Sequence, residues 1–327
     1  MVSVALTVTI APKNNQEFFL SAIKPPKFEL AFLGPRFWPV WLGVLVLYTL
    51  TWLPLPVIRK LGAGAGRLIG LIVPKRVKVA KRNIALTYPE LCEAEVERLT
   101  RENTRRAGMA LFETAMGWWW PGWRIKRHFT LEGYEHVEAA LAQGKGIFGL
   151  ALHNMNLEFA CRGVGYTHPS IAFYRKHNNP LIDYLQYHGR ARSNKYMIHK
   201  RSAKSLIAAL DANELCLYLP DQDYGRAQSV FVPFGGVEKT ATSTATLMFA
   251  KRANCVPMIF TSQYTKNGYK VKIYPPMPEL AELDSEPALT LLNEHVANIV
   301  AEQPESYLWM HKRFKTRPSE SDPSLYE

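Results

Sequence analysis

The sequence has few cysteines and no internal repeat. Its four cysteines lie far apart and form no C-x-x-C pair, which excludes a disulfide-rich scaffold and argues against a zinc site. No segment recurs with a period of about 20–50 residues, so a solenoid is not expected. With 47% hydrophobic and 21% charged residues, the chain of 327 residues is typical of a globular protein with one large domain or two small ones.

Acidic residues are also scarce. There are 28 Asp and Glu against 40 Lys and Arg, which gives a formal net charge of +12. Such a charge attracts anions, so nucleic acid, an anionic membrane surface, a phosphorylated substrate and an acidic carrier protein are all candidate partners. No recognisable RNA-binding or DNA-binding module surrounds the aromatic and basic segment 309–317, and we therefore expect no nucleic acid partner.

Residues 37–58 contain no charged side chain, and this run is about as long as the ~20 residues that a helix needs to cross a bilayer. Pro39, Pro54 and Pro56 confine an unbroken helix to about residues 40–53, so an interfacial or re-entrant segment is the alternative. Six Lys and Arg occupy the twenty residues after the run, against three in the twenty residues before it. This asymmetry predicts a single N-terminal membrane anchor with the bulk of the protein facing the cytoplasm.

The segment 59–127 is expected to be helical, basic and close to the membrane. Gly62, Gly64 and Gly66 form a G-x-G-x-G string, but no strand precedes it and no acidic residue follows at the spacing of a dinucleotide-binding motif. We therefore expect these small residues to permit close helix packing. Residues 93–120 have the apolar periodicity of a helix.

From about residue 128, short apolar runs alternate with helical stretches. This alternation predicts a single α/β domain with a mostly parallel central sheet flanked by helices, whose ligands bind beyond the carboxyl ends of the strands. The predicted strands are residues 146–152, 170–174, 215–219, 255–260 and 269–274, and the predicted helices are 157–164, 180–192, 203–213 and 242–253. The expected organisation is an N-terminal tail (1–36), a membrane helix (37–58), the basic helical region (59–127), the α/β core (128–318) and a C-terminal tail (319–327).

His153 directly follows the first predicted strand of the core, and Glu158 stands five residues later. On one continuous helix these residues would point about 140° apart, but a loop that leads into a helix near Glu158 can bring them together. A carboxylate bonded to one imidazole nitrogen leaves the other nitrogen free to accept a proton from a hydroxyl. We therefore expect His153 to act as a general base that is not paired with a serine nucleophile of the protein. A surface histidine near a helix start is the alternative, because chance alone yields about one such spacing in this sequence.

Asp221 and Asp223 follow the predicted strand 215–219. An Asp-x-Asp turn at a strand end is typical of glycosyltransferases that hold a divalent metal on a sugar diphosphate. An Asp-rich turn capped by Gly225 is the alternative.

Cationic and amide side chains follow the predicted strand 170–174. We expect a cluster that recognises phosphate or carboxylate groups, although each of these side chains alone would suit a solvated surface. Its candidate members are Arg175 and Asn178 after the strand, with Arg190, Arg192 and Lys195 on the helical segment that follows.

Eight blocks, taken in order, resemble the late acyltransferases of lipid A biosynthesis, within the lysophospholipid acyltransferase superfamily. The likeness is greatest to the lauroyl-transferring type and covers about residues 24–318. The blocks are PRFWPVWLGV at Pro35, KRNIALTYPEL at Lys81, GWWWP at Gly117, HNMNLE at His153, NNPLIDYLQYHGRARSNK at Asn178, LPDQDYG at Leu219, SVFVPFGG at Ser229 and WMHKRFKTRP at Trp309.

The resemblance implies an inner-membrane enzyme that needs no cofactor or metal. It would move a fatty acyl chain from acyl carrier protein to a hydroxyl of a hydroxyacyl chain on a phosphorylated, Kdo-lipid IV(A)-type lipid A precursor. His153 and Glu158 match the family's H-x4-D/E catalytic pair, in which Glu158 would orient His153. Arg175, Asp221 and Asp223 fall in blocks assigned to binding and site architecture. A metal-dependent, membrane-associated glycosyltransferase and an inactive lipid-binding scaffold are the alternatives.

Overall fold

The computed structural model describes residues 22–327. Its centre is a seven-stranded sheet in the order β1-β9-β8-β2-β5-β3-β4, and every neighbouring pair is parallel except β8 and β9. The predicted α/β class with a mostly parallel central sheet is therefore confirmed. The strands are β1 (Phe129–Glu132), β2 (Gly146–Ala151), β3 (Ser170–Tyr174), β4 (Asn194–His199), β5 (Leu215–Tyr218), β8 (Cys255–Thr265) and β9 (Gly268–Ile273).

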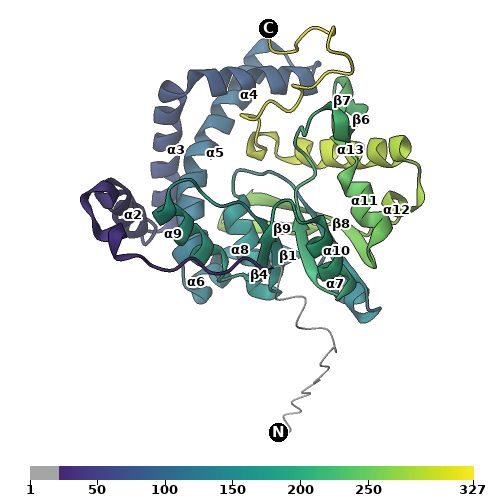
Figure 1. Ribbon diagram of the computed structural model, residues 1–327. Coiled ribbons are helices and arrows are strands. Elements are labelled where there is room, and N and C mark those ends of the chain that lie inside the picture. Colours follow the sequence, from purple (N-terminus) through teal and green to yellow (C-terminus); the bar gives the residue numbers. More distant parts are fainter. Residues whose placement is uncertain (1–21) are drawn as a thin grey trace.

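Helices cover both faces of the sheet (Figure 1). Strand β2 is buried along its whole length, because Ile147 packs in the core on one face and Phe148 packs in the core on the other. A strand buried on both sides carries a continuous apolar run, which is the pattern that identified it in the sequence. One face is covered by α7 (Tyr134–Ala142) and α8 (Leu157–Thr167), and the other by α10 (Ala203–Asp211), α11 (Ala245–Arg252), α12 (Glu279–Glu282) and α13 (Ser285–Glu302).

At two predicted helices of the core, a strand begins or ends where the sequence had indicated helix. The helix expected at 180–192 ends at Arg190 as α9 (Pro180–Arg190), and Lys195 lies on β4 rather than on a helical segment, because the chain there pairs with β3 at the sheet edge. The helix expected at 242–253 begins at Ala245, since the residues before it complete the hairpin of β6 (Ser229–Phe234) and β7 (Val237–Ser243). In both places strand pairing overrides the local helical pattern.

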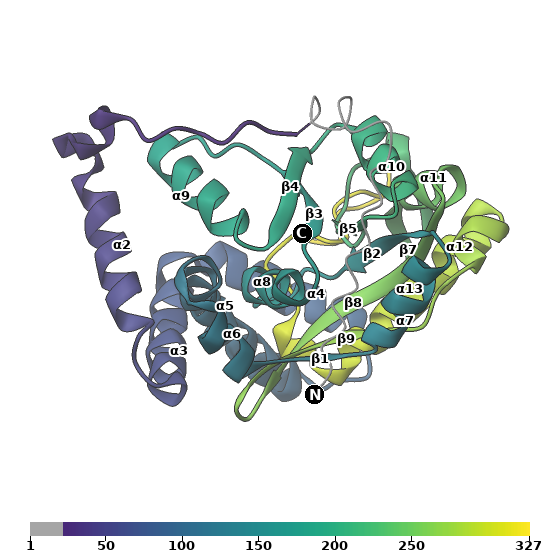
Figure 2. The ribbon, with the colours of Figure 1, turned by 90° about the horizontal axis from the view of Figure 1, so that it is seen from below.

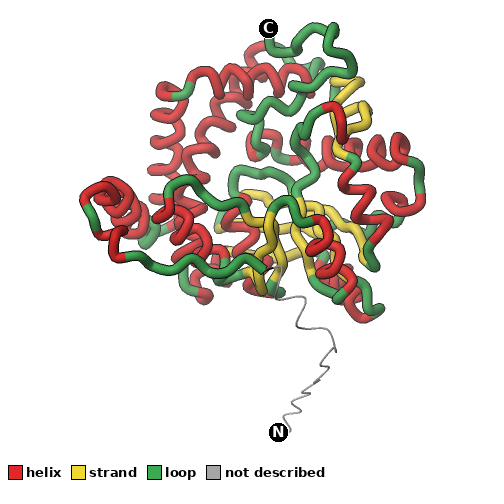
Figure 3. Tube along the Cα trace, viewed as in Figure 1, coloured by secondary structure: helices red, strands yellow, loops and turns green. Residues whose placement is uncertain are grey.

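The predicted close packing of glycines is confirmed between α3 (Leu55–Ile72) and α5 (Glu93–Trp119). A Cβ atom on Gly66 would lie 2.4 Å from the carbonyl oxygen of Thr104, and a Cβ atom on Gly108 would lie 2.1 Å from the backbone nitrogen of Gly66. Only glycine lets the two backbones approach so closely. In Figure 3, α3, α5 and α4 (Pro74–Thr87) form a helical layer beside the strands.

The expected membrane helix at 37–58 is not continuous. It consists of α2 (Trp38–Leu50) and the first turns of α3, separated by a turn at 51–54 that ends in Pro54. Among residues 22–327, no helix is both long enough and apolar enough to cross a membrane. Figure 2 shows α2 at the outer edge of the molecule, away from the sheet.

The structure describes part of the predicted N-terminal tail and all of the predicted C-terminal tail. Residues 1–21 of the N-terminal tail lie outside the described residues, while the rest of that tail includes the 3-10 turns Leu30–Leu33 and Pro35–Phe37. The C-terminal tail packs on α4, since the hydroxyl of Tyr326 donates to Oδ1 of Asn83. The remaining short elements are α6 (Gly122–His128) and the 3-10 turns Arg226–Gln228 and Pro304–Ser306.

Candidate active site

His153 and Asp221 form a hydrogen-bonded pair at the carboxyl edge of the sheet. Nδ1 of His153 lies 2.6 Å from Oδ1 of Asp221, and the backbone N–H of His153 donates to Oδ2 of the same carboxylate at 2.8 Å. Asp221 is almost fully buried, whereas the His153 side chain keeps 19% of its surface exposed. The pair thus anchors the imidazole through Nδ1, and part of the ring stays accessible to solvent.

The sheet order explains why these two residues meet. His153 follows β2 and Asp221 follows β5, and β2 and β5 are parallel neighbours. The carboxyl ends of adjacent parallel strands lie side by side, so the loops that leave them share one edge of the sheet.

The loop that carries His153 is fixed by buried amides. The Asn154 side chain donates to Oγ1 of Thr261 and to the carbonyl oxygen of Ser262, both on β8. The carbonyl oxygen of His153 accepts from the backbone N–H of Leu308 at 2.9 Å. These bonds leave the His153 backbone little freedom and define where its ring points.

The electrostatics of the pair favour an ionised Asp221. Burial acts to raise the pKa of this carboxyl, but the charge of His153 and the two hydrogen bonds from it hold the pKa below its ordinary value. An ionised carboxylate can only accept a hydrogen bond, so Nδ1 of His153 is the donor in this contact, and Nε2 is the ring nitrogen that Asp221 leaves free. Tyr307 supports the turn, since its hydroxyl donates to the backbone oxygen of Asp221.

Glu158 makes a different pair from the one expected. It lies in the first turn of α8, forms an ion pair with Arg190 and accepts a hydrogen bond from Nε1 of Trp118 at 3.1 Å. The carboxylate bonded to His153 is that of Asp221, and the structure pairs Glu158 with Arg190 rather than with His153. The physical reason is the sheet order, which brings the loop after β5 directly to His153.

The other predicted binding residues do not come together at one site. Arg175 and Asn178 are exposed in the loop between β3 and α9, and Arg192 donates to the backbone oxygen of Trp118. Lys195 pairs with Glu214, at the amino ends of the strands and on the opposite edge from His153. Of the five predicted cationic and amide residues, Arg190 is the one held by Glu158.

Asp223 has a structural partner of its own. Its carboxylate accepts from the backbone N–H and from the hydroxyl of Thr316, and from the backbone N–H of Gly225. It therefore ties the turn to the C-terminal segment while Asp221 serves His153. No group of three or more His, Cys, Asp or Glu side chains in residues 22–327 is arranged to hold a metal ion.

Comparison with known proteins identifies the family. The model of bacterial lipid A biosynthesis acyltransferases matches residues 25–316. The chain belongs to this family. It is 41% identical over 303 residues to the lipid A biosynthesis lauroyltransferase of Escherichia coli, which covers 92% of this chain and 99% of that protein. It is 38% identical over 304 residues to the palmitoleoyltransferase of lipid A biosynthesis from the same organism, covering 92% and 98%.

A solved structure also matches, that of the 1-acyl-sn-glycerophosphate acyltransferase PlsC from Thermotoga maritima. The TM-score is 0.36 and the identity 14%, with 74% of this chain and 98% of that chain covered.

Membership of this lipid A acyltransferase family confirms the predicted resemblance and the predicted acyltransferase class. The glycosyltransferase alternative is wrong, because the chain belongs to an acyltransferase family and the two carboxylates of its Asp-x-Asp turn face different partners.

Sequence reasoning missed how this acyltransferase holds its histidine. It recognised His153 and Asp221 separately, each at the end of a predicted strand, but did not place the two strands side by side. It also missed Asn154 and Tyr307, which fix the loop and the turn from outside the expected pair. The order of parallel strands is the signal that would have joined them.

Proposed function

We propose that this acyltransferase moves a fatty acyl chain of the lauroyl type from acyl carrier protein to a hydroxyl of a hydroxyacyl chain on a phosphorylated lipid A precursor. The observation that carries the proposal is the His153–Asp221 pair at the carboxyl edge of the sheet. The 41% identity to a lauroyltransferase supports the acyl type, and the net charge of +12 suits an acidic carrier and a phosphorylated acceptor.

In the proposed mechanism, Nε2 of His153 takes the proton of the acceptor hydroxyl as its oxygen attacks the carbonyl carbon of the thioester. The carbon–oxygen bond forms, the carbon–sulfur bond breaks, and the proton passes to the thiolate of the departing carrier. Asp221 holds the Nδ1 tautomer of His153 and stabilises the imidazolium while it carries that proton. Glu158 acts one step away, because it fixes the guanidinium of Arg190 beside the start of α8.

The same proposal includes the cytoplasmic face of an inner membrane as the place of action. Helix α2 has no buried residue, and large apolar side chains continue along the outer side of α3. An apolar helix surface of this kind is stable when it lies within the lipid interface. Its most exposed members are Trp38, Leu42, Leu45, Leu68, Leu71 and Ile72. Flotation with anionic vesicles tests this, and protein that stays with the unbound fraction contradicts it.

The function is tested by replacing His153 with Ala in the full-length protein. We expect a loss of about 10²–10⁴ in turnover, because a general base is lost, while the protein still folds with a cooperative but somewhat lower melting transition, since Asp221 loses its partner. The measurement is mass spectrometry of the acylated lipid together with release of the carrier thiol. His295→Ala, at an exposed position of α13, is the matched control and should keep full activity.

Near-normal turnover of the His153 variant would remove that residue from the mechanism. A wild-type protein that leaves a lipid A precursor unmodified would contradict the proposed function and favour the inactive scaffold.

A further inference from the structure

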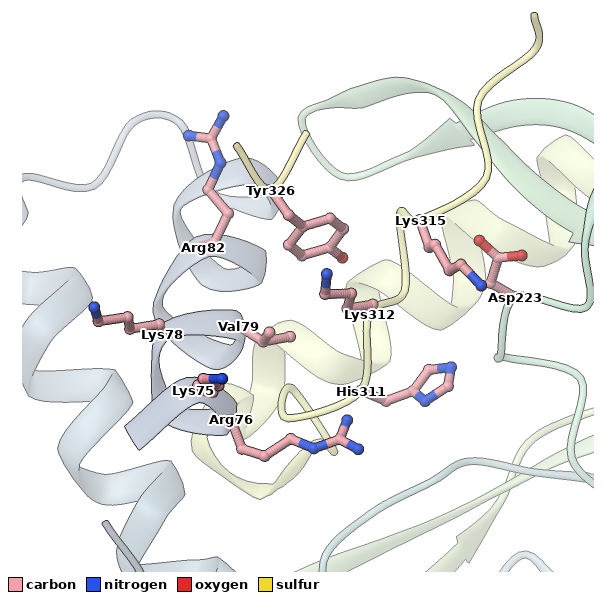
Figure 4. A pocket seen from close by; sticks show the side chains of 10 residues that line it. All are labelled: Lys75, Arg76, Lys78, Val79, Arg82, Asp223, His311, Lys312, Lys315 and Tyr326. Carbon is pink, nitrogen blue, oxygen red and sulfur yellow. The ribbon is translucent and has the colours of Figure 1, made fainter. Parts of the chain in front are cut away.

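A cationic pocket of about 730 Å³ lies between α4 and the C-terminal segment (Figure 4). It is lined mainly by basic side chains and by a single carboxylate, that of Asp223. Its basic members are Lys75, Arg76, Lys78 and Arg82 from α4, with Lys312 and Lys315 from the C-terminal segment.

The charge of the cationic pocket is not neutralised within the protein. Within residues 22–327, none of its basic side chains forms a salt bridge, and the one carboxylate in its wall accepts hydrogen bonds from Thr316 and Gly225. Lys81 provides the contrast, because it stands on the same helix and pairs with both Glu93 and Glu97. Several uncompensated cations around one cavity create a strongly positive potential, which an anion would stabilise.

The walls of the cationic pocket are held in place. The guanidinium of Arg82 donates to the backbone oxygen of Leu325 at 2.6 Å, and that of Arg76 donates to the backbone oxygen of Met310 at 3.3 Å. The ammonium of Lys312 lies 5.1 Å from the ring centre of Tyr326. Helix α4 and the C-terminal segment are thus tied together on both sides of the cavity, which reduces the ordering that a ligand must impose.

The cationic pocket adjoins the candidate active site. Asp223 in its wall follows Asp221 by two residues, and a chain of two residues spans at most about 7 Å. His311, also in the wall, comes three residues after Leu308, which is bonded to the backbone of His153. Figure 4 shows the guanidinium of Arg76 directed toward the side of the pocket where His311 lies. Burial and then the charge of His153 lower the pKa of His311, as expected for neighbouring imidazoles.

We propose that the cationic pocket binds phosphate groups on the sugar headgroup of the acceptor lipid, while the acceptor hydroxyl reaches His153. This inference rests on the proposed function. Lysine and arginine form charge-assisted hydrogen bonds with phosphate oxygens. The volume is that of a site for a small molecule of sugar-phosphate size, whereas a carrier protein docks on a broad surface of about 800 Å² on each partner. The concave shape of the cationic pocket therefore favours the lipid headgroup over the carrier protein as its ligand.

The test uses the double variant Lys312→Gln/Lys315→Gln, since neither lysine has a hydrogen-bond or salt-bridge partner in the described part of the chain. The matched control is Lys145→Gln/Lys204→Gln, which removes the same charge at two exposed lysines that do not line the pocket. Each protein is assayed with a phosphorylated precursor and with the same precursor after phosphatase treatment. We expect KM for the phosphorylated acceptor to rise about tenfold or more in the pocket variant, with little change for the treated acceptor or for the acyl donor.

Equal losses on both acceptors would overturn the inference, and so would a rise in KM confined to the acyl donor, which would assign the pocket to the carrier. Binding of the two lipids to the His153→Ala protein in detergent micelles separates this inference from the proposed function. Preferential binding of the phosphorylated lipid that Lys312→Gln/Lys315→Gln abolishes would support the pocket even if the wild-type protein showed no turnover. Equal affinity for both lipids would overturn it.

Discussion

Asp221 and Glu113 are both buried carboxyl groups, yet their surroundings drive their pKa values in opposite directions. Asp221 bonds to His153, and the pKa of Asp221 is lowered. Glu113, on α5, accepts a hydrogen bond from the hydroxyl of Tyr264 at 2.9 Å and has no salt bridge among the described residues. Burial raises the pKa of Glu113 to about 7, and the tyrosine bonds and the more distant charge of Arg106 offset only part of that effect.

The difference shows what keeps a buried carboxyl ionised. Burial alone favours the neutral acid, and a cation in direct contact reverses the preference. The ionised Asp221 can therefore fix a tautomer and stabilise a transient imidazolium. Glu113, with a pKa of about 7, is protonated below neutral pH and packs in the core between α5 and β8. Replacing each carboxyl by its neutral amide separates these two roles.

The largest effect is expected at Asp221, in the candidate active site. Asp221→Asn removes the charge that orients His153, because an amide can bond Nδ1 without favouring its protonated form. We expect kcat to fall about 10³–10⁴-fold, with KM for the acceptor changed far less. Steady-state kinetics with the phosphorylated precursor measures both constants.

Circular dichroism and thermal melting of the same variant show whether the fold is retained. A folded Asp221→Asn protein with a kcat within tenfold of the wild type would mean that the contact with His153 has no part in catalysis.

Much of the fold follows from local patterns in the sequence. The buried strands β2, β3 and β5 are predicted almost to the residue, because a strand covered on both faces needs a continuous apolar run. The edge strand β4 is missed, since its exposed positions carry polar side chains such as Lys195 and its pairing with β3 is a property of the sheet. The interruption near Pro54 is visible in the sequence, but the relation of α2 to α3 is not.

The site is predicted less completely than the fold. His153 and Asp221 each stand at the end of a predicted strand, which is a local signal. That they form the pair depends on β2 and β5 being neighbours, although 68 residues separate the two side chains in the chain. The spacing of His153 and Glu158 is a local signal too, but in the structure Arg190, from α9, is the partner of the glutamate.

Replacing Glu113, in the core, should change how the stability of the protein depends on pH rather than its activity. The pKa of Glu113 lies at about 7 in the folded protein against 4.5 as its ordinary value, so the native state binds the extra proton between these pH values. Stability therefore falls as pH rises through that window, by about 3 kcal/mol in all. Glu113→Gln removes this dependence and should gain about that much over the wild type between pH 4.5 and pH 8.

Urea denaturation at several pH values measures this difference in the free energy of unfolding. Glu294→Gln, at an exposed position of α13, is the control and should follow the wild type at each pH. A Glu113 variant whose stability parallels the wild type across the range would show that this carboxyl is already ionised in the fold.

The smallest effect is expected at Glu158. Unlike Asp221 and Glu113, this carboxylate is partly exposed, and it is paired with a guanidinium. Glu158→Gln keeps an acceptor for Trp118 but loses the charge that holds Arg190, so we expect kcat/KM to fall about 10- to 100-fold. Arg190→Gln should match it, and the double variant should be no worse than the poorer single one, since the two residues act as a unit. If Glu158→Gln instead lost as much as Asp221→Asn and the two effects did not add, the glutamate would share the task of orienting His153, as the spacing in the sequence had indicated.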